Sequence, residues 1–362
     1  MKTFFIKTFG CQANKSDSER IVADYLARGF KQVYSWKKAD EIVVNTCSVR
    51  QRVEDRVAGL LLNIDKHAPK KHKIILTGCM LHYGEKTLRK KLPQINKVLP
   101  INQLGFNAPS VRTDKNHAWV PISSGCNSFC TYCIVPYSRG REISRPQRDI
   151  LVEVKNLLEN GYSEITLLGQ NVNSYGLEDI DINTRKSNFN KPKFIPPFVK
   201  LIQELSKFEK LKQINFITAN PWDFWDELIT EIARNKKINR YIHLPFQSGS
   251  DKILKLMNRG YTGNDYLRLV EKIKDKVPDV VFGTDIIVGF PNETDKDFQD
   301  TVNLAKKVNF KVAFIAQYSP RPGTVASRIY SDNISPQIKK KRWQILEDLI
   351  NKPNLKTRPL IQ

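Results

Sequence analysis

The most informative segment of the sequence is a cysteine-rich loop, Ser123-Ser124-Gly125-Cys126-Asn127-Ser128-Phe129-Cys130-Thr131-Tyr132-Cys133. Its three cysteines are spaced C-x3-C-x2-C, which differs from the usual zinc pattern of two paired halves that supply four ligands. Three thiolates in one loop can hold three irons of a 4Fe-4S cube and leave the fourth iron open. The alternatives are a zinc site completed by a distant residue and a loop of structural thiols.

The cysteine spacing, with Tyr132 directly before the last cysteine, resembles the cluster loop of the radical S-adenosylmethionine (SAM) enzymes. The resemblance implies a 4Fe-4S cluster on Cys126, Cys130 and Cys133, with SAM chelated by the open iron through its amino and carboxylate groups. In that superfamily an electron from the cluster cleaves SAM to methionine and a 5'-deoxyadenosyl radical. Tyr132 is then a candidate contact of SAM.

The bulk composition indicates an intracellular protein of about two domains. The 362 residues are 40% hydrophobic, which is enough for full cores. No run of about 18 apolar residues is present, so we expect no membrane span. The start, residues 1–11, is short and interrupted by lysine, and predicts a first β-strand rather than a signal peptide. We expect a cytoplasmic protein whose six cysteines are metal ligands rather than disulfides.

The charge balance favours a polyanionic partner. The chain has 59 basic and 37 acidic residues, a formal charge of +22. RNA is the simplest polyanion that such an excess would serve. A generally lysine-rich proteome would give the same balance, so the excess alone does not establish RNA binding.

The first hundred residues alternate short apolar runs with helical patterns. We expect strands at 3–8, 41–45, 73–77 and 97–100, and helices at 16–28, 53–66 and 86–91. Ser16 is placed to cap the first helix, with Glu19 at the capping-box position. The alternation predicts a doubly wound parallel sheet with helices on both faces.

The other three cysteines follow the first three of these strands. Cys11, Cys47 and Cys79 each lie at the carboxyl end of a strand, where parallel α/β sheets place their ligands. We therefore expect the three thiols to meet at one edge of the sheet. Gly10 and Gly78 precede two of them and allow a tight turn. The alternative is three unrelated buried cysteines.

The motifs around these cysteines resemble the amino-terminal domain of the methylthiotransferases. They are Thr8-Phe9-Gly10-Cys11-Gln12-Ala13-Asn14, Asn45-Thr46-Cys47-Ser48-Val49-Arg50 and Thr77-Gly78-Cys79-Met80. The resemblance implies an auxiliary 4Fe-4S cluster on Cys11, Cys47 and Cys79. The glutamine after Cys11, Gln12, resembles the branch of the family that makes 2-methylthio-N(6)-isopentenyladenosine in tRNA. Ala13 is a departure, because methionine is common at this position in the tRNA enzymes.

The second half of the chain predicts a partial (β/α)6 barrel. Strands are expected at 119–122, 164–169, 213–218, 241–246, 280–288 and 312–318. Helices are expected at 147–160, 198–207, 224–234, 264–276, 295–308 and 336–349. Six βα units are too few for a closed eight-stranded barrel, and loops at the carboxyl strand ends would carry the chemistry. The fold class is therefore α/β throughout.

Polar residues at the strand ends are the remaining site candidates. The resemblance to the superfamily places SAM near Gly169, Gln170, Asn171, Gln247, Asp285 and Ile287. Arginines near the cluster loop could hold a SAM carboxylate, an RNA phosphate or carbonyls of the loop itself. Candidates for these substrate or cluster-flanking roles are Asn14, Arg139, Arg141 and Arg145.

The predicted organisation is an amino-terminal domain at 1–108, a linker at 109–117, a radical SAM core at 118–350 and a tail at 351–362. Residues 177–197 are rich in Asp, Asn, Lys and Pro, and read as a mobile insertion. Family members usually carry a small RNA-binding β-barrel after the core. We expect no counterpart of it in the tail.

The resemblance therefore implies a tRNA methylthiotransferase with two 4Fe-4S clusters and SAM as cofactors. It would act at carbon 2 of an N(6)-isopentenyl-type adenosine next to the anticodon. We expect a monomer that binds the anticodon loop and receives electrons from a donor such as flavodoxin or ferredoxin. Two alternatives have the same chemistry, on a ribosomal-protein aspartate or on threonylcarbamoyl-adenosine tRNA. A third is a non-catalytic zinc RNA-binding protein.

Overall fold

The computed structural model describes residues 1–49, 51–69, 71–100, 110–187 and 194–357. The chain divides into two compact units. One comprises residues 1–115 together with 134–141, and the other comprises 116–133 together with residue 142 onward. The linker expected at 109–117 falls partly outside the described residues. The predicted boundaries also did not anticipate that 134–141 packs with the amino-terminal unit.

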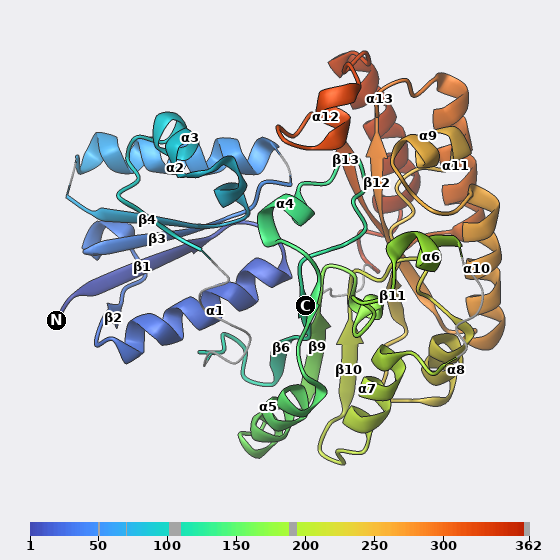
Figure 1. Cartoon of the computed structure of the whole chain (residues 1–362), viewed down its shortest axis with the longest axis horizontal. Helices are drawn as coiled ribbons and strands as arrows, with labels where there is room; N and C mark the ends of the chain where they lie inside the picture. Colours follow the sequence, from blue (N-terminus) through green and yellow to red (C-terminus); the bar gives the residue numbers. More distant parts are fainter. Residues whose placement is uncertain (50, 70, 101–109, 188–193, 358–362) are drawn as a thin grey trace. The chain divides into compact units, whose positions relative to one another are not determined.

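The first unit is a parallel sheet with the strand order β2-β1-β3-β4-β5. Its strands are β1 (Thr3–Thr8), β2 (Lys31–Gln32), β3 (Glu41–Thr46), β4 (Lys73–Gly78) and β5 (Lys97–Leu99). Helices α1 (Gln12–Ala27), α2 (Gln51–His67) and α3 (Glu85–Lys91) cover it, with α1 on one face and α2 and α3 on the other (Figure 1). Every residue of β3 is buried because both faces are covered.

Two apolar cores follow from this double cover. Ile21 and Tyr25 of α1 pack with Phe4 and Val43 on one face. On the other face the core includes residues of α2 and alternate residues of β3 and β4, namely Ile42, Val44, Val57, Leu61, Ile64, Ile74 and Leu76. Alternation along the strands divides the apolar side chains between the two faces. The prediction of a doubly wound parallel sheet is confirmed.

The expected start of the first helix is wrong. Helix α1 begins at Gln12, and Cys11 occupies its N-cap position. Ser16 is therefore inside the helix, where it is buried, and its hydroxyl cannot cap the terminus. Glu19 accepts hydrogen bonds from Arg112 and Thr113 instead of completing a capping box. The helix begins early because the turn at Gly10 and Cys11 directly follows the end of β1.

The second unit carries six described parallel strands in chain order. These are β6 (His117–Pro121), β9 (Glu164–Leu168), β10 (Gln213–Phe216), β11 (Tyr241–His243), β12 (Val281–Val288) and β13 (Val312–Gln317). They form two ladders, β6-β9-β10 and β11-β12-β13. A parallel bridge between Ile214 and Ile238 joins the edges of β10 and the segment before β11. The partial barrel predicted from the six βα units is confirmed.

The main core of this unit lies between the strands and an outer layer of helices. The outer helices are α5 (Gln147–Glu159), α7 (Pro197–Ser206), α8 (Asp226–Arg234), α10 (Gly263–Lys276), α11 (Asp295–Val308) and α13 (Pro336–Leu346) (Figure 1). Shorter elements are β7 (Ser123–Ser124), β8 (Ile143–Ser144), α6 (Ile182–Ser187), α9 (Asp251–Leu256) and α12 (Val325–Ile329). A further short helix, α4 (Val135–Arg139), belongs to the first unit.

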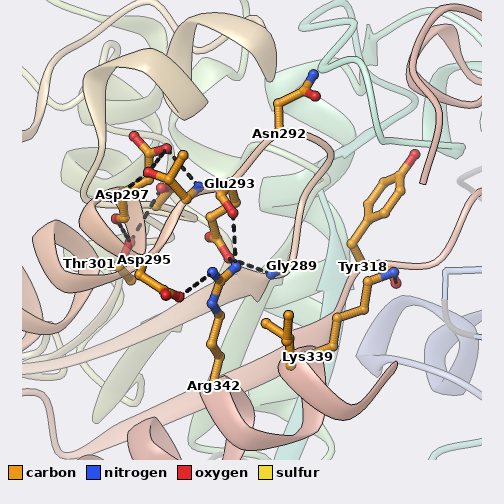
Figure 2. Close-up of polar contacts among 12 residues, drawn as sticks. Gly289, Asn292, Glu293, Asp295, Asp297, Thr301, Tyr318, Lys339 and Arg342 are labelled. Carbon is orange, nitrogen blue, oxygen red and sulfur yellow. Dashed lines mark hydrogen bonds and ion pairs between the residues drawn. The ribbon is translucent and has the colours of Figure 1, made fainter. Parts of the chain in front are cut away.

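Helix α13 forms hydrogen bonds with the loop that follows β12. Figure 2 shows the Arg342 guanidinium between two carboxylates, bonding Glu293 and Asp295 at 2.7 Å each. The Glu293 carboxylate also accepts the backbone N–H of Gly289 at 2.7 Å. Arg342 and Glu293 are both buried, and removing one partner of such a pair leaves the other charge uncompensated. The end of α13 is therefore part of the barrel rather than an appendage.

No helix within the described residues is long and apolar enough to cross a membrane.

Candidate functional site

The C-x3-C-x2-C motif forms a tight loop between β7 and α4. Cys126 and Cys130 are buried, and Cys133 is half-buried. Two positive φ angles shape the loop, +80° at Gly125 and +45° at Phe129. The second is unusual for a residue with a side chain, and such strain persists only where surrounding contacts hold the backbone. The turn is closed by the Cys133 N–H, which donates to the carbonyl of Cys130 at 2.9 Å.

Backbone contacts anchor this loop to the barrel. Thr131 donates its N–H to the carbonyl of Met257 at 3.1 Å and its hydroxyl to Leu256 at 2.8 Å. The Thr131 carbonyl accepts the N–H of Ala326 at 2.7 Å. The Asn258 amide donates to the carbonyl of Phe129 at 3.1 Å. The loop is therefore held by elements more than 120 residues distant in sequence.

Hydrogen-bond donors point at the thiols. The Asn171 amide donates to the sulfur of Cys126 at 3.1 Å and to the Ser128 hydroxyl at 3.0 Å. The Ser128 N–H lies 3.4 Å from the same sulfur, and Arg259 approaches the sulfur of Cys130 at 3.5 Å. Burial raises the pKa of the Cys126 thiol to about 11, so a bound cation is needed to favour the thiolate.

The other SAM candidates lie at strand ends of the same unit. A side chain at Gly169 would place its Cβ 2.5 Å from the Ser123 hydroxyl and 3.2 Å from Cα of Val172, so a larger residue would crowd this turn. Gln247 has a φ of +67°, donates its N–H to the carbonyl of Asp285 and accepts the N–H of Ile287, each at 3.0 Å. These three residues therefore meet beside β12. Gln170 is half-buried.

Tyr132 is half-buried at the edge of the barrel core. It packs against an apolar cluster of Ile253, Met257, Phe290, Tyr318 and Ala326. Burial raises the pKa of its hydroxyl well above the ordinary value, with the thiol of Cys130 acting in the same direction. The ring therefore supports the loop from the barrel side.

The remaining three cysteines meet at the carboxyl edge of the first unit's sheet. Cys11 caps α1 after β1, Cys47 follows β3, and Cys79 begins the 3-10 turn η2 (Cys79–Tyr83) after β4. A Cβ on Gly10 would lie 2.8 Å from Cβ of Cys47, so the ends of β1 and β3 approach closely. Strands β1 and β3 flank the point where the strand order reverses, the usual ligand position in such sheets.

Asn14 ties these strand ends together. Its amide donates to the Asn45 side chain and to the carbonyl of Thr46, each at 2.9 Å. The Asn45 amide returns a bond to the carbonyl of Asn14 at 2.8 Å. The Asn14 oxygen accepts the Cys11 thiol at 3.4 Å. Asn14 is fully buried, which favours a role in orienting the Cys11 turn over direct contact with a large substrate.

Arg139 reaches the same thiols from α4. Its guanidinium donates to Asp17 at 2.8 Å and to Asn14 at 3.4 Å. Burial acts to lower its pKa, but Asp17 and the thiols of Cys79 and Cys11 raise it well above the ordinary value. A fixed positive charge therefore lies beside the thiol group of the first unit.

The other two arginine candidates differ from Arg139. Arg141 is exposed in the same segment. Arg145 is buried in the second unit, where its guanidinium pairs with Glu153 and donates to the carbonyls of Pro121 and Asp149. These contacts favour a role for Arg145 in holding the start of α5.

All six cysteines are free thiols. Within the described ranges, no three His, Cys, Asp or Glu side chains gather closely enough to hold a single metal ion. Thiolate donors suit iron–sulfur cubes, which spread their ligands more widely than one ion does.

Comparison with known proteins gives the family. The radical SAM superfamily model matches residues 120–305, and the model of the uncharacterized protein family UPF0004 matches residues 3–100. The chain is 41% identical to the tRNA-2-methylthio-N(6)-dimethylallyladenosine synthase of Thermotoga petrophila, covering 98% of this chain and 82% of that protein. The proteins of the same name from Petrotoga mobilis and Bacillus cereus are each 38% identical over 97% of this chain and cover 84% and 72% of those proteins.

The chain belongs to the radical SAM methylthiotransferase family. Membership makes it an enzyme, a transferase, and implies a 4Fe-4S cluster and SAM as cofactors. The zinc RNA-binding alternative is thereby excluded.

Solved structures support the fold of this methylthiotransferase. The radical SAM methyltransferase TsrM from Kitasatospora setae superposes with a TM-score of 0.61 at 12% identity, covering 90% of this chain and 77% of TsrM. The cobalamin-dependent SAM radical enzyme OxsB superposes with a TM-score of 0.54 at 10% identity, covering 98% of this chain and 56% of OxsB. At these identities the likeness concerns the fold alone.

One region of the methylthiotransferase contains an element that the sequence analysis did not expect. The segment 177–197 was expected to be an insertion between βα elements, and its described part contains the short helix α6, whose Arg185 and Lys186 are buried. Residues 188–193 lie outside the described residues. The Lys186 ammonium donates to the carbonyls of Ser128 and Asn258 at 3.0 and 2.9 Å. No periodic pattern marks these two residues, so the sequence offered no signal for them.

Arg185 lies between two buried carboxyl groups. Its guanidinium is 3.7 Å from Glu142 and 3.4 Å from Asp223. Asp223 is further held by the Ser174 hydroxyl at 2.7 Å. Neither carboxyl oxygen of Glu142 has a hydrogen-bond partner among the described residues. Burial therefore raises the pKa of Glu142 to about 8 despite the opposing charge of Arg185.

This raised pKa makes stability depend on pH. Between the usual value of 4.5 and about 8, the unfolded chain loses the Glu142 proton while the folded chain keeps it. Stability is therefore lost as pH rises through this window, on the order of 4 kcal/mol in all. We expect Glu142→Gln to flatten the slope and to be more stable than wild type at pH 8 but not at pH 4.5. Urea unfolding at both values measures this.

The exposed Glu159→Gln variant is the control, since it removes one carboxyl group from the surface of the same unit. Equal slopes for wild type and Glu142→Gln would contradict the assignment of a buried, neutral Glu142.

Proposed function

We propose that this methylthiotransferase binds two 4Fe-4S clusters and modifies carbon 2 of an N(6)-isopentenyl-type adenosine next to the anticodon of a tRNA. Cys126, Cys130 and Cys133 would hold the radical SAM cluster. Cys11, Cys47 and Cys79 would hold the auxiliary cluster. The observation that carries the proposal is the grouping of all six cysteines into two sets of three, one set in each unit.

The residues around the first set fit a cluster with one open iron. Three thiols lie in one short loop, and N–H donors from Asn171 and Ser128 point at the sulfur of Cys126. Hydrogen bonds to ligating sulfurs are an ordinary part of iron–sulfur sites. Tyr132 and Thr131 fix the loop so that its sulfurs are positioned before a cofactor arrives.

The second set fits a cluster by its placement and charge. The thiols follow three neighbouring strand ends, and Arg139 supplies a positive charge that offsets three thiolates. Gly78 has a φ of +90°, and a Cβ there would lie 2.3 Å from the carbonyl oxygen of Thr46. The close approach of β3 and β4 at this point therefore requires glycine before Cys79.

The cofactors would supply the radical chemistry, and the protein would orient SAM and the substrate. When bound, the cluster and SAM supply the one-electron chemistry needed to remove hydrogen from a carbon that is neither acidic nor electrophilic. Gln247, Asp285 and Ile287 bring the end of β11 and strand β12 together at the barrel's carboxyl edge. Asn171 and Gly169, which follow β9, place the end of that strand against the loop that carries Cys126. These elements would orient SAM and the adenine and exclude water.

The tRNA partner is proposed from the names of the related enzymes and from the net charge of +22. The last turn of α3 carries Arg89, Lys90 and Lys91, and all three side chains are exposed. An adenosine in a loop can leave its stack and enter a pocket. The electron would come from a low-potential donor such as flavodoxin or ferredoxin, in the cytoplasm.

Mass spectrometry of tRNA nucleosides tests the substrate. A strain lacking the gene should accumulate N(6)-isopentenyladenosine without its 2-methylthio group, and the wild-type gene should restore it. Loss of 2-methylthio-threonylcarbamoyl-adenosine instead, or of a methylthio group on a ribosomal-protein aspartate, would overturn the proposed substrate while leaving the chemistry in place.

A further inference from the structure

Two cations, Lys186 and Arg259, lie at the cluster loop with no carboxylate partner in the described part of the chain. Lys186 is buried and Arg259 is half-buried. Among the described residues, neither cation forms a hydrogen bond or ion pair with an aspartate or glutamate. Buried charges are normally paired, because removing an ion from water is costly. Another group must therefore supply the negative charge that compensates these two cations.

Lys186 is held in place from several sides. Its ammonium donates to the carbonyl of Ser128, within the cluster loop, and to that of Asn258. It lies 5.4 Å from the centre of the Trp222 ring. Its stem passes over Gly260, where a Cβ would come within 2.5 Å of the Lys186 Cβ. A side chain at residue 260 would therefore displace the lysine.

Arg259, which lies between Asn258 and Gly260, approaches the same cluster loop. Its guanidinium lies 3.5 Å from the sulfur of Cys130 and donates to the carbonyl of Pro245 at 3.0 Å. It stacks 4.8 Å from the Trp222 ring, so one tryptophan faces both cations. An aromatic face offsets part of a cation's desolvation but supplies no negative charge.

Arg185 does not belong with these two cations, because Asp223 and Glu142 already face it. Among the described residues, the negative charge nearest to Lys186 and Arg259 would be that of the cysteine thiolates and of the iron–sulfur cluster that they hold. Three thiolates on an oxidised 4Fe-4S cube, with a core charge of +2, give a net charge of −1. One-electron reduction changes the core to +1 and the net charge to −2.

We infer that Lys186 and Arg259 are the counter-charges of the reduced radical SAM cluster and raise its reduction potential. Two positive charges match the net charge of −2 in the reduced state. The reduction takes one electron from an external low-potential donor, breaks no bond and needs no proton. This inference rests on the proposed assignment of the cluster to Cys126, Cys130 and Cys133. Lys186 and Arg259 act on the reaction indirectly, through the electrostatic effect of their charges on that cluster.

The test is a redox titration of the reconstituted full-length chain, followed by electron paramagnetic resonance, without SAM. The background carries Cys11→Ala, Cys47→Ala and Cys79→Ala, so that one cluster contributes to the signal. Lys186→Met and Arg259→Met should each lower the ratio of reduced to oxidised cluster about tenfold at a fixed solution potential, a shift of about −59 mV for a one-electron couple. Lys186→Arg and Arg259→Lys should stay near the parent value.

The exposed Lys200→Met variant, on α7 of the same unit, changes the net charge equally and should leave the potential unchanged. Iron is measured first. A parent with no iron would overturn the cluster assignment and the inference with it. About four irons with unchanged potentials in both Met variants would overturn the inference alone. If those variants instead only weakened SAM binding in equilibrium dialysis, the cations would serve the SAM carboxylate and the inference would be wrong.

Discussion

Cys130→Ala is expected to abolish the reductive cleavage of SAM. The sulfur of Cys130 is buried, faces Arg259 and lies in a loop whose backbone is held by Met257 and Ala326. Alanine leaves two thiolates, which cannot hold a cube with one open iron. Without such a cluster, the proposed site would lack the group that binds SAM and supplies the electron. We expect complete loss of 5'-deoxyadenosine formation, measured by chromatography of reactions run without oxygen and with dithionite.

The same variant should keep the auxiliary site. Iron should fall from about eight to about four per chain, because the thiols of the first unit do not depend on the barrel loop. Lys200→Met, with its exposed side chain, is a suitable control. Cleavage of SAM by Cys130→Ala at a rate near that of wild type would show that the cluster is held elsewhere.

Cys47→Ala is expected to separate the two halves of the reaction. Cys47 is buried at the end of β3, and its Cβ is the atom that a side chain at Gly10 would meet. Removing its thiolate leaves Cys11 and Cys79, which are too few ligands for an auxiliary cube. SAM cleavage should persist near the wild-type rate, whereas transfer of the methylthio group to tRNA should be lost completely.

Two measurements on one sample check this result. 5'-Deoxyadenosine reports SAM cleavage, and mass spectrometry of the digested tRNA reports methylthiolation. A matched variant is Ser48→Ala, at the next residue, which removes a hydroxyl that bonds Glu54 but no thiol. If Cys47→Ala still methylthiolated tRNA, the proposal that the auxiliary cluster is needed for methylthio transfer would be wrong. Loss of SAM cleavage as well would mean that Cys47 serves the first reaction too.

Most strands could be predicted from the sequence because they are apolar runs with clear ends. Thr3–Thr8 matches its prediction to the residue, and the strands at 41–45 and 73–77 each extend by one residue. Burial on both faces explains this success for β3 and β4, whose residues are almost all buried. The cysteine spacing and the positions of Cys11, Cys47 and Cys79 were equally visible, because each thiol follows a strand.

The missed features depend on contacts between distant residues. The order of α6 depends on bonds from Lys186 to carbonyls 58 and 72 residues away, and a polar segment shows no trace of such partners. The helix start at Gln12 depends on the geometry of Gly10, which propensity does not reveal. The place of α4 depends on distant contacts, among them the bond between Arg139 and Asp17, 122 residues apart.

That last bond has a consequence for how such proteins can be recombined. Residues 134–141 leave the barrel sequence and complete the first unit before the chain returns. A gene fragment ending at residue 115 would encode a sheet without α4, and the buried Asp17 would keep Arg20 but lose its second guanidinium. The two units are thus interleaved in the gene, and neither can be exchanged as a simple cassette without taking part of the other with it.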